Sequence, residues 1–456
     1  MAADRHAVIW TRAGVAPVKM GHLTVTDRQC RFTYEPDYLE TGLPGLSVLY
    51  PTGFVGNNTL VWERTPYFDF QPQIQSLIPP ASESNFQRRL ILSYLEQQGR
   101  QPAPGFDSDW AILMMSGHGG IGHLDIFEDD SKASAWYNDA IPTPFFQVSD
   151  KFGLSLKEFL TWLDDDADSV LEALGPTPSV GGAIPKLLLS IPASGWDGRV
   201  ALPRRQLSDD RTDIILKLEK ETYPGIAALE ALALEVHKEA GFETPRYWLT
   251  DINGIPAIAI ERFDRTAHGK PIFTETLYSV MASGDRRITN HYSGTYDDIG
   301  RAFDRSPIPL VSHPAQSKQH LLKRLLLSFV TGNGDLHLEN LSLRQFGDQI
   351  GFSPVYDPTP MRAYRKHDLM VSMSFGDYGA FGKGDSVINF SEALLHFSKN
   401  LGITRQTLRS TIETVLPLGE EFVHRMNQIE SVPVENRKHL ESTCRQMEQK
   451  LKLAVG

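Results

Sequence analysis

Polar side chains that could serve in phosphoryl transfer stand close together in the second half of the chain. Asp335, His337 and Asn340 follow an apolar stretch that ends at Gly332, and they lie in a segment too polar to be core. In phosphoryl transfer an aspartate accepts the proton of the attacking hydroxyl, an asparagine five residues later holds a magnesium ion, and a more distant aspartate holds the bridging magnesium ion. Asp335 and Asn340 have this spacing, and Asp357 supplies the second carboxylate.

The same residues also have a simpler interpretation. Asp and Asn side chains commonly cap turns, so one Asp-x-x-x-x-Asn match is weak by itself. In protein kinases the pattern is His-Arg-Asp-x-x-x-x-Asn followed by Asp-Phe-Gly. This chain has the same spacing between Asp and Asn, but its flanking residues differ. At this point the loop could be catalytic or purely structural.

A helix and a hairpin are expected to hold these carboxylates in place. Residues 317–330 carry a stripe of apolar side chains at helical spacing, which predicts a helix leading into the polar loop. After Asn340, alternating apolar residues on the two sides of Gly347-Asp348 predict a β-hairpin. The hairpin would return the chain toward the loop and bring in Asp357.

A glycine-containing segment farther upstream has features of a phosphate-binding loop. Residues 176–192 combine a proline-bounded start, the pair Gly181-Gly182 and an apolar strand. Glycine lets backbone N–H groups approach a phosphate because no side chain blocks the way. A single glycine pair is a weak signal, however. The other glycine-rich stretch, residues 116–127, lacks the lysine of a Walker motif and is predicted to be a turn that enters a strand.

A lysine and a glutamate in the next two predicted elements extend the pattern of a nucleotide site. Lys217 interrupts the apolar strand 213–218, and pairing with nucleotide phosphates would account for a lysine there. Glu230 lies at the edge of the apolar face of a helix that ends at Gly241. The two predict the lysine and glutamate pair of a kinase N-lobe, unless Glu230 is solvated and Lys217 extends from a sheet edge.

Four separated motifs resemble the HipA family of bacterial serine/threonine kinases, the toxins of HipBA toxin-antitoxin modules. The motifs are GNGDLHLENLS with SPVYD around Asp335, SVGGAIPK before the first strand of the predicted N-lobe, the lysine and glutamate pair, and ERFDR at residues 261–265. A looser match covers GLPGLSVLYP and the glycine-rich turn nearer the N-terminus. In order along the chain, the motifs would supply phosphate loop, lysine, hinge, catalytic base and metal ligands.

The resemblance implies an α+β, bilobal protein-kinase-like fold of the HipA type, with an extra mixed N-terminal subdomain and a helical C-lobe. The corresponding boundaries are residues 1–150 for the N-terminal subdomain, 151–262 for the nucleotide-binding N-lobe and 263–456 for the C-lobe with the catalytic loop. In the family the N-terminal subdomain helps to contact the antitoxin.

The resemblance also assigns roles to individual residues. Asp335 would be the catalytic base, and Asn340 and Asp357 would be the magnesium ligands. The residues placed around ATP are Gly181, Gly182, Ala183, Ile184, Pro185, Lys186, Lys217, Glu230, Glu261, Arg262, Phe263, His337, Asn340, Tyr356 and Asp357. Within this set, Glu261 to Phe263 form the hinge that offers backbone groups to the adenine edge.

A regulatory serine belongs to the same resemblance. The family carries a serine at the position of Ser179, whose autophosphorylation displaces the phosphate loop and shuts the kinase off. A phosphate there adds nearly two negative charges beside a pocket for ATP phosphates, so disruption is the physical expectation. Alternatively, Ser179 is only a turn residue after Pro178. Two departures from the family bear on the site: Glu339 stands where many members carry lysine, and Ile184-Pro185 stiffens the loop.

Composition and charge limit the classes of partner. The 456-residue chain has 41% hydrophobic and 22% charged residues, which is ordinary for a globular protein of about two or three domains. Its formal net charge of -11 argues against binding nucleic acid through its own field. Cys30 and Cys444 form no metal-spaced cluster, and no segment has the roughly 20 apolar residues that span a bilayer. We therefore expect a cytoplasmic protein that does not enter a membrane.

The resemblance predicts a kinase that uses ATP and Mg²⁺ to phosphorylate a protein serine, with glutamyl-tRNA synthetase as the family's target. A HipB-like helix-turn-helix antitoxin would neutralise it, and operator DNA would be contacted mainly through that antitoxin. Two alternatives keep the fold. One is a kinase whose acceptor is a small molecule, such as an aminoglycoside or a lipid head group. The other is a non-catalytic corepressor or scaffold that only holds its antitoxin.

Overall fold

The chain folds into two compact units. The computed structural model describes residues 4–54, 58–82, 85–138, 144–147, 186–252, 254–379 and 388–455. Unit 1 comprises Met1–Leu218 with Arg246–Glu275, and unit 2 comprises Glu219–Pro245 with Thr276–Gly456. The chain therefore leaves unit 1 once to build a helix of unit 2 and then returns. The mixed α and β composition agrees with the predicted fold class, while the boundaries proposed from the sequence remain predictions.

The N-terminal part of unit 1 is an antiparallel sheet with the strand order β4-β3-β2-β1-β5. Its strands are β1 (Arg5–Thr11), β2 (Val18–Val25), β3 (Gln29–Tyr34), β4 (Thr59–Glu63) and β5 (Asp125–Phe127). Side chains alternate between the faces of a strand, so β3 buries Cys30, Phe32 and Tyr34 and exposes Arg31 between them. The glycine-rich stretch 116–127 is a turn that enters β5, which confirms the prediction for this segment.

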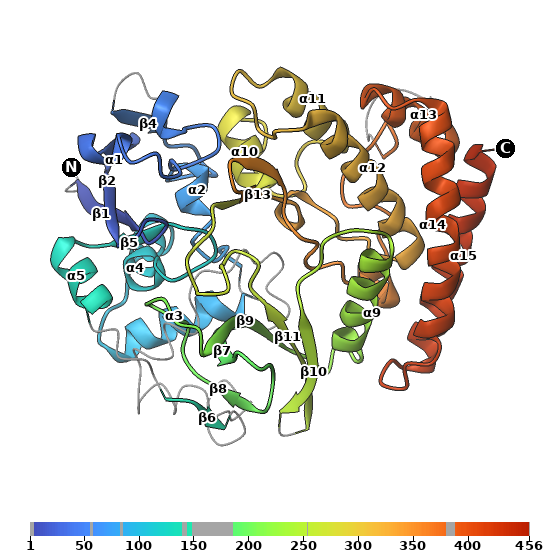
Figure 1. Ribbon diagram of the computed structural model, residues 1–456, viewed down its shortest axis with the longest axis horizontal. Coiled ribbons are helices and arrows are strands. Elements are labelled where there is room, and N and C mark those ends of the chain that lie inside the picture. The colour runs from blue at the N-terminus through green and yellow to red at the C-terminus, as the bar shows by residue number, and fades with distance from the viewer. Residues whose placement is uncertain are drawn as a thin grey trace. The chain divides into compact units, whose positions relative to one another are not determined.

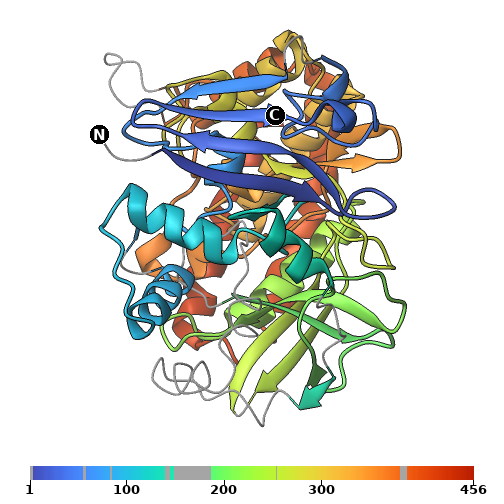
Figure 2. The ribbon, with the colours of Figure 1, turned by 90° about the vertical axis from the view of Figure 1, so that its left-hand side faces the viewer.

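Helices accompany this sheet, and the longer ones lie along one side of it, in cyan and teal in Figure 2. Their bounds are α1 (Pro36–Leu39), α2 (Pro72–Gln75), α3 (Phe86–Gln97), α4 (Phe106–Ser116) and α5 (Asp130–Asn138), with a 3-10 turn η1 (Thr52–Phe54). The start of α3 is set by Asn85, whose side chain accepts a hydrogen bond from Arg88 N at 2.9 Å and so satisfies a first-turn donor. Helices α4 and α5 both pack against β5.

The second sheet of unit 1 is also antiparallel and has the order β10-β11-β9-β7. Its strands are β7 (Lys186–Pro192), β9 (Arg211–Leu218), β10 (Tyr247–Ile252) and β11 (Ile255–Glu261), with the small pair β6 (Phe146–Gln147) and β8 (Arg199–Val200) nearby in sequence. Every residue of β7 is buried, as expected for a strand covered on both faces. The hairpin predicted from residues 246–263 is confirmed, because Ile252 pairs with Ile255 across its turn.

A buried group of charges ties the ERFDR segment to the glycine-rich turn within unit 1. Arg262 donates to Asp264 at 3.0 and 2.8 Å, and Arg265 donates to the same carboxylate at 2.7 Å. Both arginines also donate to the carbonyl of Gly120, at 2.6 and 2.7 Å, while Gly122 N donates to Asp264 at 2.8 Å. Burial alone would raise the pKa of Asp264, but the two guanidinium groups lower it to about 2.

The same group of charges continues into both sheets of unit 1. Arg12 donates to Asp125 of β5 at 3.1 Å and to the carbonyl of Arg204 at 2.9 Å. Arg204 in turn donates to Asp213 of β9 at 3.2 Å. All four side chains are buried, so each charge needs a partner of opposite sign to be tolerated there. These contacts explain why the N-terminal sheet and the second sheet belong to one compact unit.

Unit 2 is mainly helical. Its elements are α9 (Ile226–Glu239), α10 (Leu277–Gly284), α11 (Tyr296–Arg305), α12 (Pro314–Thr331), α13 (Phe390–Asn400), α14 (Arg405–Met426), α15 (Val434–Val455), the hairpin β13 (Ser342–Phe346) and β14 (Gln349–Phe352), and the 3-10 turns η2 (Leu338–Asn340), η3 (Met361–Ala363) and η4 (Arg365–His367); β12 (Thr274–Thr276) stands where the chain passes between units. Helix α12 contacts α14 and α15, and Figure 1 shows these helices running side by side. Within the described chain, no helix is long and apolar enough to cross a membrane.

Helix α12 is the buried centre of unit 2. The predicted helix 317–330 is confirmed and extends slightly at both ends, from Pro314 to Thr331. Its last turns are buried on all sides, including Leu325, Leu326 and Phe329, because two long helices cover it. The contact with α14 is close: a Cβ atom on Gly419 would lie 2.7 Å from Val330 Cβ. This packing gives the loop that follows α12 a rigid starting point.

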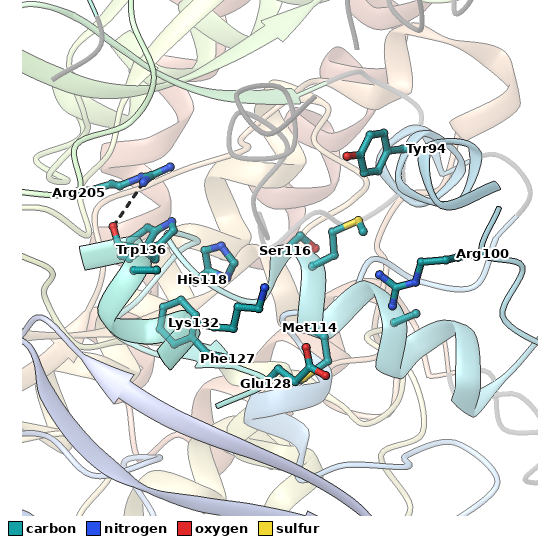
Figure 3. A pocket seen from close by; sticks show the side chains of 13 residues that line it. Tyr94, Arg100, Met114, Ser116, His118, Phe127, Glu128, Lys132, Trp136 and Arg205 are labelled. Carbon is teal, nitrogen blue, oxygen red and sulfur yellow. Dashed lines mark hydrogen bonds between the residues drawn. The ribbon is translucent and has the colours of Figure 1, made fainter. Parts of the chain in front are cut away.

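A cavity of about 370 Å³ lies in unit 1 (Figure 3). Among the described residues, Arg100, Lys132 and Arg205 line it together with one carboxylate, Glu128, and with the ring of His118. Its lining contains none of the predicted site residues that the structure describes. Basic side chains therefore outnumber acidic ones in the described lining.

Burial lowers the pKa of several histidines in both units. The group comprises His118, His123, His237, His291 and His320. For His237, on α9, burial is the largest cause and the charge of Arg324 adds to it, which lowers the pKa to about 3. The folded protein therefore keeps this ring neutral at pH values where an unfolded chain, with a histidine pKa near 6.5, takes up a proton.

We predict that the protein loses stability as the pH falls from 6.5 toward 4. In that window the unfolded chain binds more protons than the folded one. Each such histidine therefore lowers the free energy of unfolding by about 1.4 kcal/mol per pH unit. Urea unfolding at a series of pH values measures this slope. The variant His237→Gln should have a shallower slope than the parent, and His396→Gln, at an exposed position on α13, is the matched control. Equal slopes for His237→Gln and the parent would contradict the account.

Candidate active site

The polar loop predicted to be catalytic begins where α12 ends, and two glycines shape it. Gly332 ends the helix with a left-handed backbone (φ 71°), and a Cβ atom there would lie 2.3 Å from Leu440 Cδ1. At Gly334, a Cβ atom would lie 2.1 Å from the main-chain oxygen of Leu369. Both positions therefore need glycine, and the chain turns at once from the buried helix into the loop.

Asp335 is held through its main chain. Its N–H donates to Asn333 Oδ1 at 3.0 Å, and its carbonyl oxygen accepts from His337 N at 2.9 Å and from Asn340 Nδ2 at 2.7 Å. The Asp335 side chain is 36% exposed. The loop thus fixes the origin of the side chain and presents the carboxylate at the surface of unit 2.

The amide of Asn340 is oriented by the same contact. Because its nitrogen donates to the Asp335 carbonyl, its oxygen is turned the other way. That Oδ1 atom is buried and has no hydrogen-bond partner within the described chain. Leaving a buried acceptor without a hydrogen bond costs on the order of 1–3 kcal/mol of stability, so this oxygen would gain from contact with a ligand.

The hairpin β13–β14 returns the chain to this loop, as predicted from the sequence. The hydroxyl of Tyr356 lies 2.6 Å from Ser342 Oγ and donates to the carbonyl of Glu339. Glu339 and Ser342 flank Asn340 closely in sequence, so Tyr356 fastens the segment that carries Asp357 to the Asn340 side of the loop. Burial, with the negative charges of Asp357 and Glu339, raises the pKa of Tyr356, which keeps its hydroxyl a donor.

Asp357 itself has an uncommon backbone conformation. Its φ of 50° lies in the left-handed region, which L-residues other than glycine adopt at a cost of roughly 1–2 kcal/mol. Thr359 Oγ1 reaches the Asp357 carboxylate at 3.5 Å. Strained residues of this kind concentrate at functional sites, where the surrounding structure holds a side chain in a required direction.

The oxygen atoms of Asn340 and Asp357 suit a magnesium ion. Mg²⁺ prefers oxygen ligands and usually takes only one or two protein groups, with water and phosphate oxygens completing its shell. No group of three or more His, Cys, Asp or Glu side chains that could hold a metal occurs in the part of the chain that the structure describes. An amide and a carboxylate are the kinds of protein ligand that such a shell uses, and the metal roles of Asn340 and Asp357 stay predictions.

His291 and Tyr292 also contact the loop, and neither contact was predicted from the sequence. The Tyr292 hydroxyl donates to Asp335 Oδ1 at 3.1 Å. The His291 and His337 rings lie 4.5 Å apart, and the carbonyl of His291 accepts from Leu338 N at 3.1 Å. Both belong to an irregular stretch without periodicity, so their only sequence signal was an aromatic pair in a polar segment.

His337 lies inside the loop. It is fully buried, and its Nδ1 accepts from Glu339 N at 3.3 Å while its Nε2 lies 3.7 Å from Asp335 Oδ1. His291 Nδ1 lies 3.6 Å from Glu339 Oε2, but burial lowers the pKa of His291 to about 4, so this contact joins a neutral ring to a carboxylate near pH 7. The predicted role of His337 beside ATP stays a prediction.

In unit 1, two lysines of the predicted nucleotide site stand opposite each other. Lys186 of β7 pairs with Lys217 of β9 in the antiparallel register, so both side chains point to the same face of the sheet. Both are buried, at 6% exposure. The predicted contact of both lysines with nucleotide phosphates stays a prediction.

A family model described as the HipA-like C-terminal domain matches residues 178–420, more than half of the chain. The chain belongs to the HipA family. The matched residues include both lysines, the ERFDR segment, the loop with Asp335 and the segment that ends at Asp357. The HipA assignment made from these motifs is confirmed.

Similar proteins agree with the HipA assignment. A putative kinase of Haemophilus influenzae is 24% identical over 302 residues, which covers 60% of this chain and 81% of that protein. A putative kinase of Sinorhizobium fredii is 27% identical over 200 residues, covering 41% of this chain and 43% of that protein. The HipA chain of a Shewanella oneidensis complex with HipB and operator DNA shares the fold, with a TM-score of 0.61 at 15% identity over 96% of this chain and 95% of that one.

The remaining residues that the HipA resemblance places around ATP lie in both units. Glu230, on α9 of unit 2, is 1% exposed, so the interpretation in which it is solvated is wrong. Its pairing with Lys217 of unit 1 stays a prediction. In the predicted hinge, the Glu261 side chain accepts from Arg246 at 2.7 and 2.9 Å. Phe263 is half-buried just after β11.

The side chain of Arg262, another predicted hinge residue, is bound within unit 1 by several hydrogen bonds. Its guanidinium is bound to Asp264 and to the carbonyls of Gly119 and Gly120, and it is 3% exposed. Only its main chain could therefore contribute to a hinge. The phosphate-loop residues Gly181, Gly182, Ala183, Ile184 and Pro185, and the serine Ser179, lie outside the described residues, so their roles stay predictions.

We predict that Tyr356→Phe destabilises the protein by about 1–2 kcal/mol, because it removes a buried hydroxyl that serves both Ser342 and the Glu339 carbonyl. Thermal unfolding measures the effect, with Tyr67→Phe at a 63% exposed position as the matched control. If the two variants unfold at the same temperature, Tyr356 does not fasten the Asp357 segment to the loop.

Proposed function

We propose that this HipA-family chain is a Mg-ATP-dependent protein kinase that phosphorylates serine or threonine. The observation that carries the proposal is the amide oxygen of Asn340, which is buried and has no hydrogen-bond partner within the described chain, in the loop that presents the Asp335 carboxylate. Such an oxygen can serve as a ligand to a metal ion that arrives with a nucleotide.

The residues of unit 2 would handle the proton and the acceptor. Asp335 accepts the proton of the acceptor hydroxyl as that oxygen attacks the γ-phosphorus, and the bond from the phosphorus to the β-phosphate oxygen breaks to release ADP. Asn340 and Asp357 would hold Mg²⁺. When bound, this ion neutralises charge on the phosphate oxygens. The buried histidine rings and the Glu339 carbonyl contacts keep the loop in one shape, so the carboxylate is oriented before the substrate arrives.

The residues of unit 1 would bind the nucleotide. Lys186 and Lys217, which lie buried on one face of the sheet, would contact its phosphate oxygens. Glu261 to Phe263 would offer main-chain groups to the base. The glycine-containing loop from Gly181 to Pro185 would cover the phosphates, and phosphorylation of Ser179 would put negative charge beside them and oppose binding.

The partners follow from the same proposal. The HipA of known structure is bound to HipB and operator DNA, and a HipB-like antitoxin would neutralise this kinase and make most of the DNA contacts. A formal net charge of -11 suits that division, because the chain would repel DNA through its own field. The acceptor would be a serine of a cytoplasmic protein, with glutamyl-tRNA synthetase as the first protein to test.

We predict that Asp335→Ala lowers phosphoryl transfer by about 10²- to 10⁴-fold, the usual contribution of a general base. The purified chain is incubated with labelled ATP and Mg²⁺, alone and with bacterial lysate, beside Asp335→Ala. Asp348→Ala, which removes an exposed carboxylate from the hairpin turn of the same segment, should retain activity.

The pattern of label separates the candidate functions. Label on Ser179 and on one lysate protein, lost in Asp335→Ala, supports the protein kinase. Label on a small molecule alone would point to a small-molecule kinase. Equal labelling by Asp335→Ala and the parent, or no ATP turnover by the parent at all, would contradict the proposal.

A further inference from the structure

The hydroxyl of Tyr292 occupies the position that a substrate hydroxyl needs. It donates a hydrogen bond to Asp335 Oδ1 at 3.1 Å, which is the contact that a kinase base makes with its acceptor before phosphoryl transfer. Tyr292 is 45% exposed and Asp335 36%, so the contact lies at the surface of unit 2. The tyrosine is therefore placed where an incoming acceptor would meet it first.

A tight turn fixes the main chain of Tyr292. Its N–H donates to Asn290 Oδ1 at 2.9 Å, and Ser293 N donates to the Asn290 carbonyl at 2.9 Å. The turn is joined to the catalytic loop, because Leu338 N donates to the carbonyl of His291 at 3.1 Å. The hydrogen bond between the turn and the loop thus holds the main chain of Tyr292 in place relative to the main chain of Asp335.

Neighbouring rings fix the direction of the Tyr292 side chain. Its ring stands edge-on to His337 at 5.1 Å and tilted against His291 at 4.2 Å between centroids. Burial, followed by the charge of Asp335, raises the pKa of Tyr292, so the hydroxyl keeps its proton and acts as the donor. The ring contacts are ones that a phenylalanine at this position would also make, so the hydroxyl can be removed alone.

We propose that Tyr292 is a specificity-determining residue that stands in for the acceptor hydroxyl and keeps water from using the Asp335 base. This inference rests on the proposed kinase function. Without an acceptor, Asp335 would take a proton from water, the water oxygen would bond to the γ-phosphorus, and ADP and inorganic phosphate would leave. The Tyr292 hydroxyl takes one of the hydrogen-bonding positions of the Asp335 carboxylate, on Oδ1, and so competes with such a water there.

A protein acceptor can displace Tyr292 where water cannot. A bound protein contributes contacts beyond its hydroxyl, so it can replace one exposed hydrogen bond on the carboxylate. Water has no such additional contacts and competes with Tyr292 for Asp335 through its hydrogen bonds alone. The same carboxylate would therefore favour a bound serine or threonine over the solvent.

The test compares Tyr292→Phe with the parent in the full chain, with ATP and Mg²⁺ and no acceptor. Release of inorganic phosphate should rise roughly fivefold, the change that one hydrogen bond of about 1 kcal/mol makes. The initial rate of label transfer to lysate protein should not fall, because an acceptor must displace the same hydroxyl and its own contacts are retained in the variant. The matched control is Tyr278→Phe, whose hydroxyl donates to the Thr289 carbonyl at 3.3 Å and whose ring also lies near His291, at 6.3 Å.

The outcomes separate this inference from the kinase proposal. Phosphate release that depends on Asp335 but is unchanged or lower in Tyr292→Phe overturns the role of Tyr292 and leaves the kinase proposal standing. Phosphate found on Tyr292 itself by mass spectrometry of the parent would also overturn it, because the residue would then be an acceptor. Phosphate release that is equal in Asp335→Ala and the parent would contradict both the role of Tyr292 and the kinase proposal.

Discussion

The amide of Asn340 can satisfy only one of its two ends within the described chain. Its nitrogen donates to the Asp335 carbonyl and closes the loop, which leaves its oxygen buried without a partner. The other features of the loop keep this arrangement in place. The last turns of helix α12 are buried on all sides, Gly332 and Gly334 allow the chain to turn directly after the helix, and Tyr356 fastens the returning segment. This arrangement fits the proposed role of the loop in binding a metal ion that arrives with a nucleotide.

A second constraint acts in unit 1, where charges of like and unlike sign are both buried. Lys186 and Lys217 stand opposite each other on neighbouring strands, and both are buried. In the ERFDR segment, Arg262 and Arg265 are compensated by Asp264 and by carbonyls of the glycine-rich turn. The ERFDR charges join parts of the unit, while the binding role of the two lysines stays a prediction.

Much of the site could be predicted because its parts are local in sequence. The spacing of Asp335 and Asn340, the helix before them and the hairpin after them all depend on residues within a few turns of one another. The contact of Tyr292 with Asp335 could not be predicted, because the two residues are 43 positions apart in the sequence and Tyr292 lies in an irregular stretch. The contacts of the Arg262 side chain could not be predicted for the same reason, since its carbonyl partner Gly120 is 142 positions away in the sequence. Periodicity carries no information about such contacts.

The claim that the Asn340 oxygen receives a metal bound to nucleotide is tested most directly by calorimetric titration of ATP, with and without Mg²⁺. The proteins compared are the full chain, Asn340→Ala, and the control Asn427→Ala at an exposed helix end. The account predicts that Asn340→Ala weakens Mg-ATP binding by about tenfold or more and leaves metal-free ATP binding within about twofold, while the control matches the parent. Equal affinity of Asn340→Ala and the parent for Mg-ATP would contradict it.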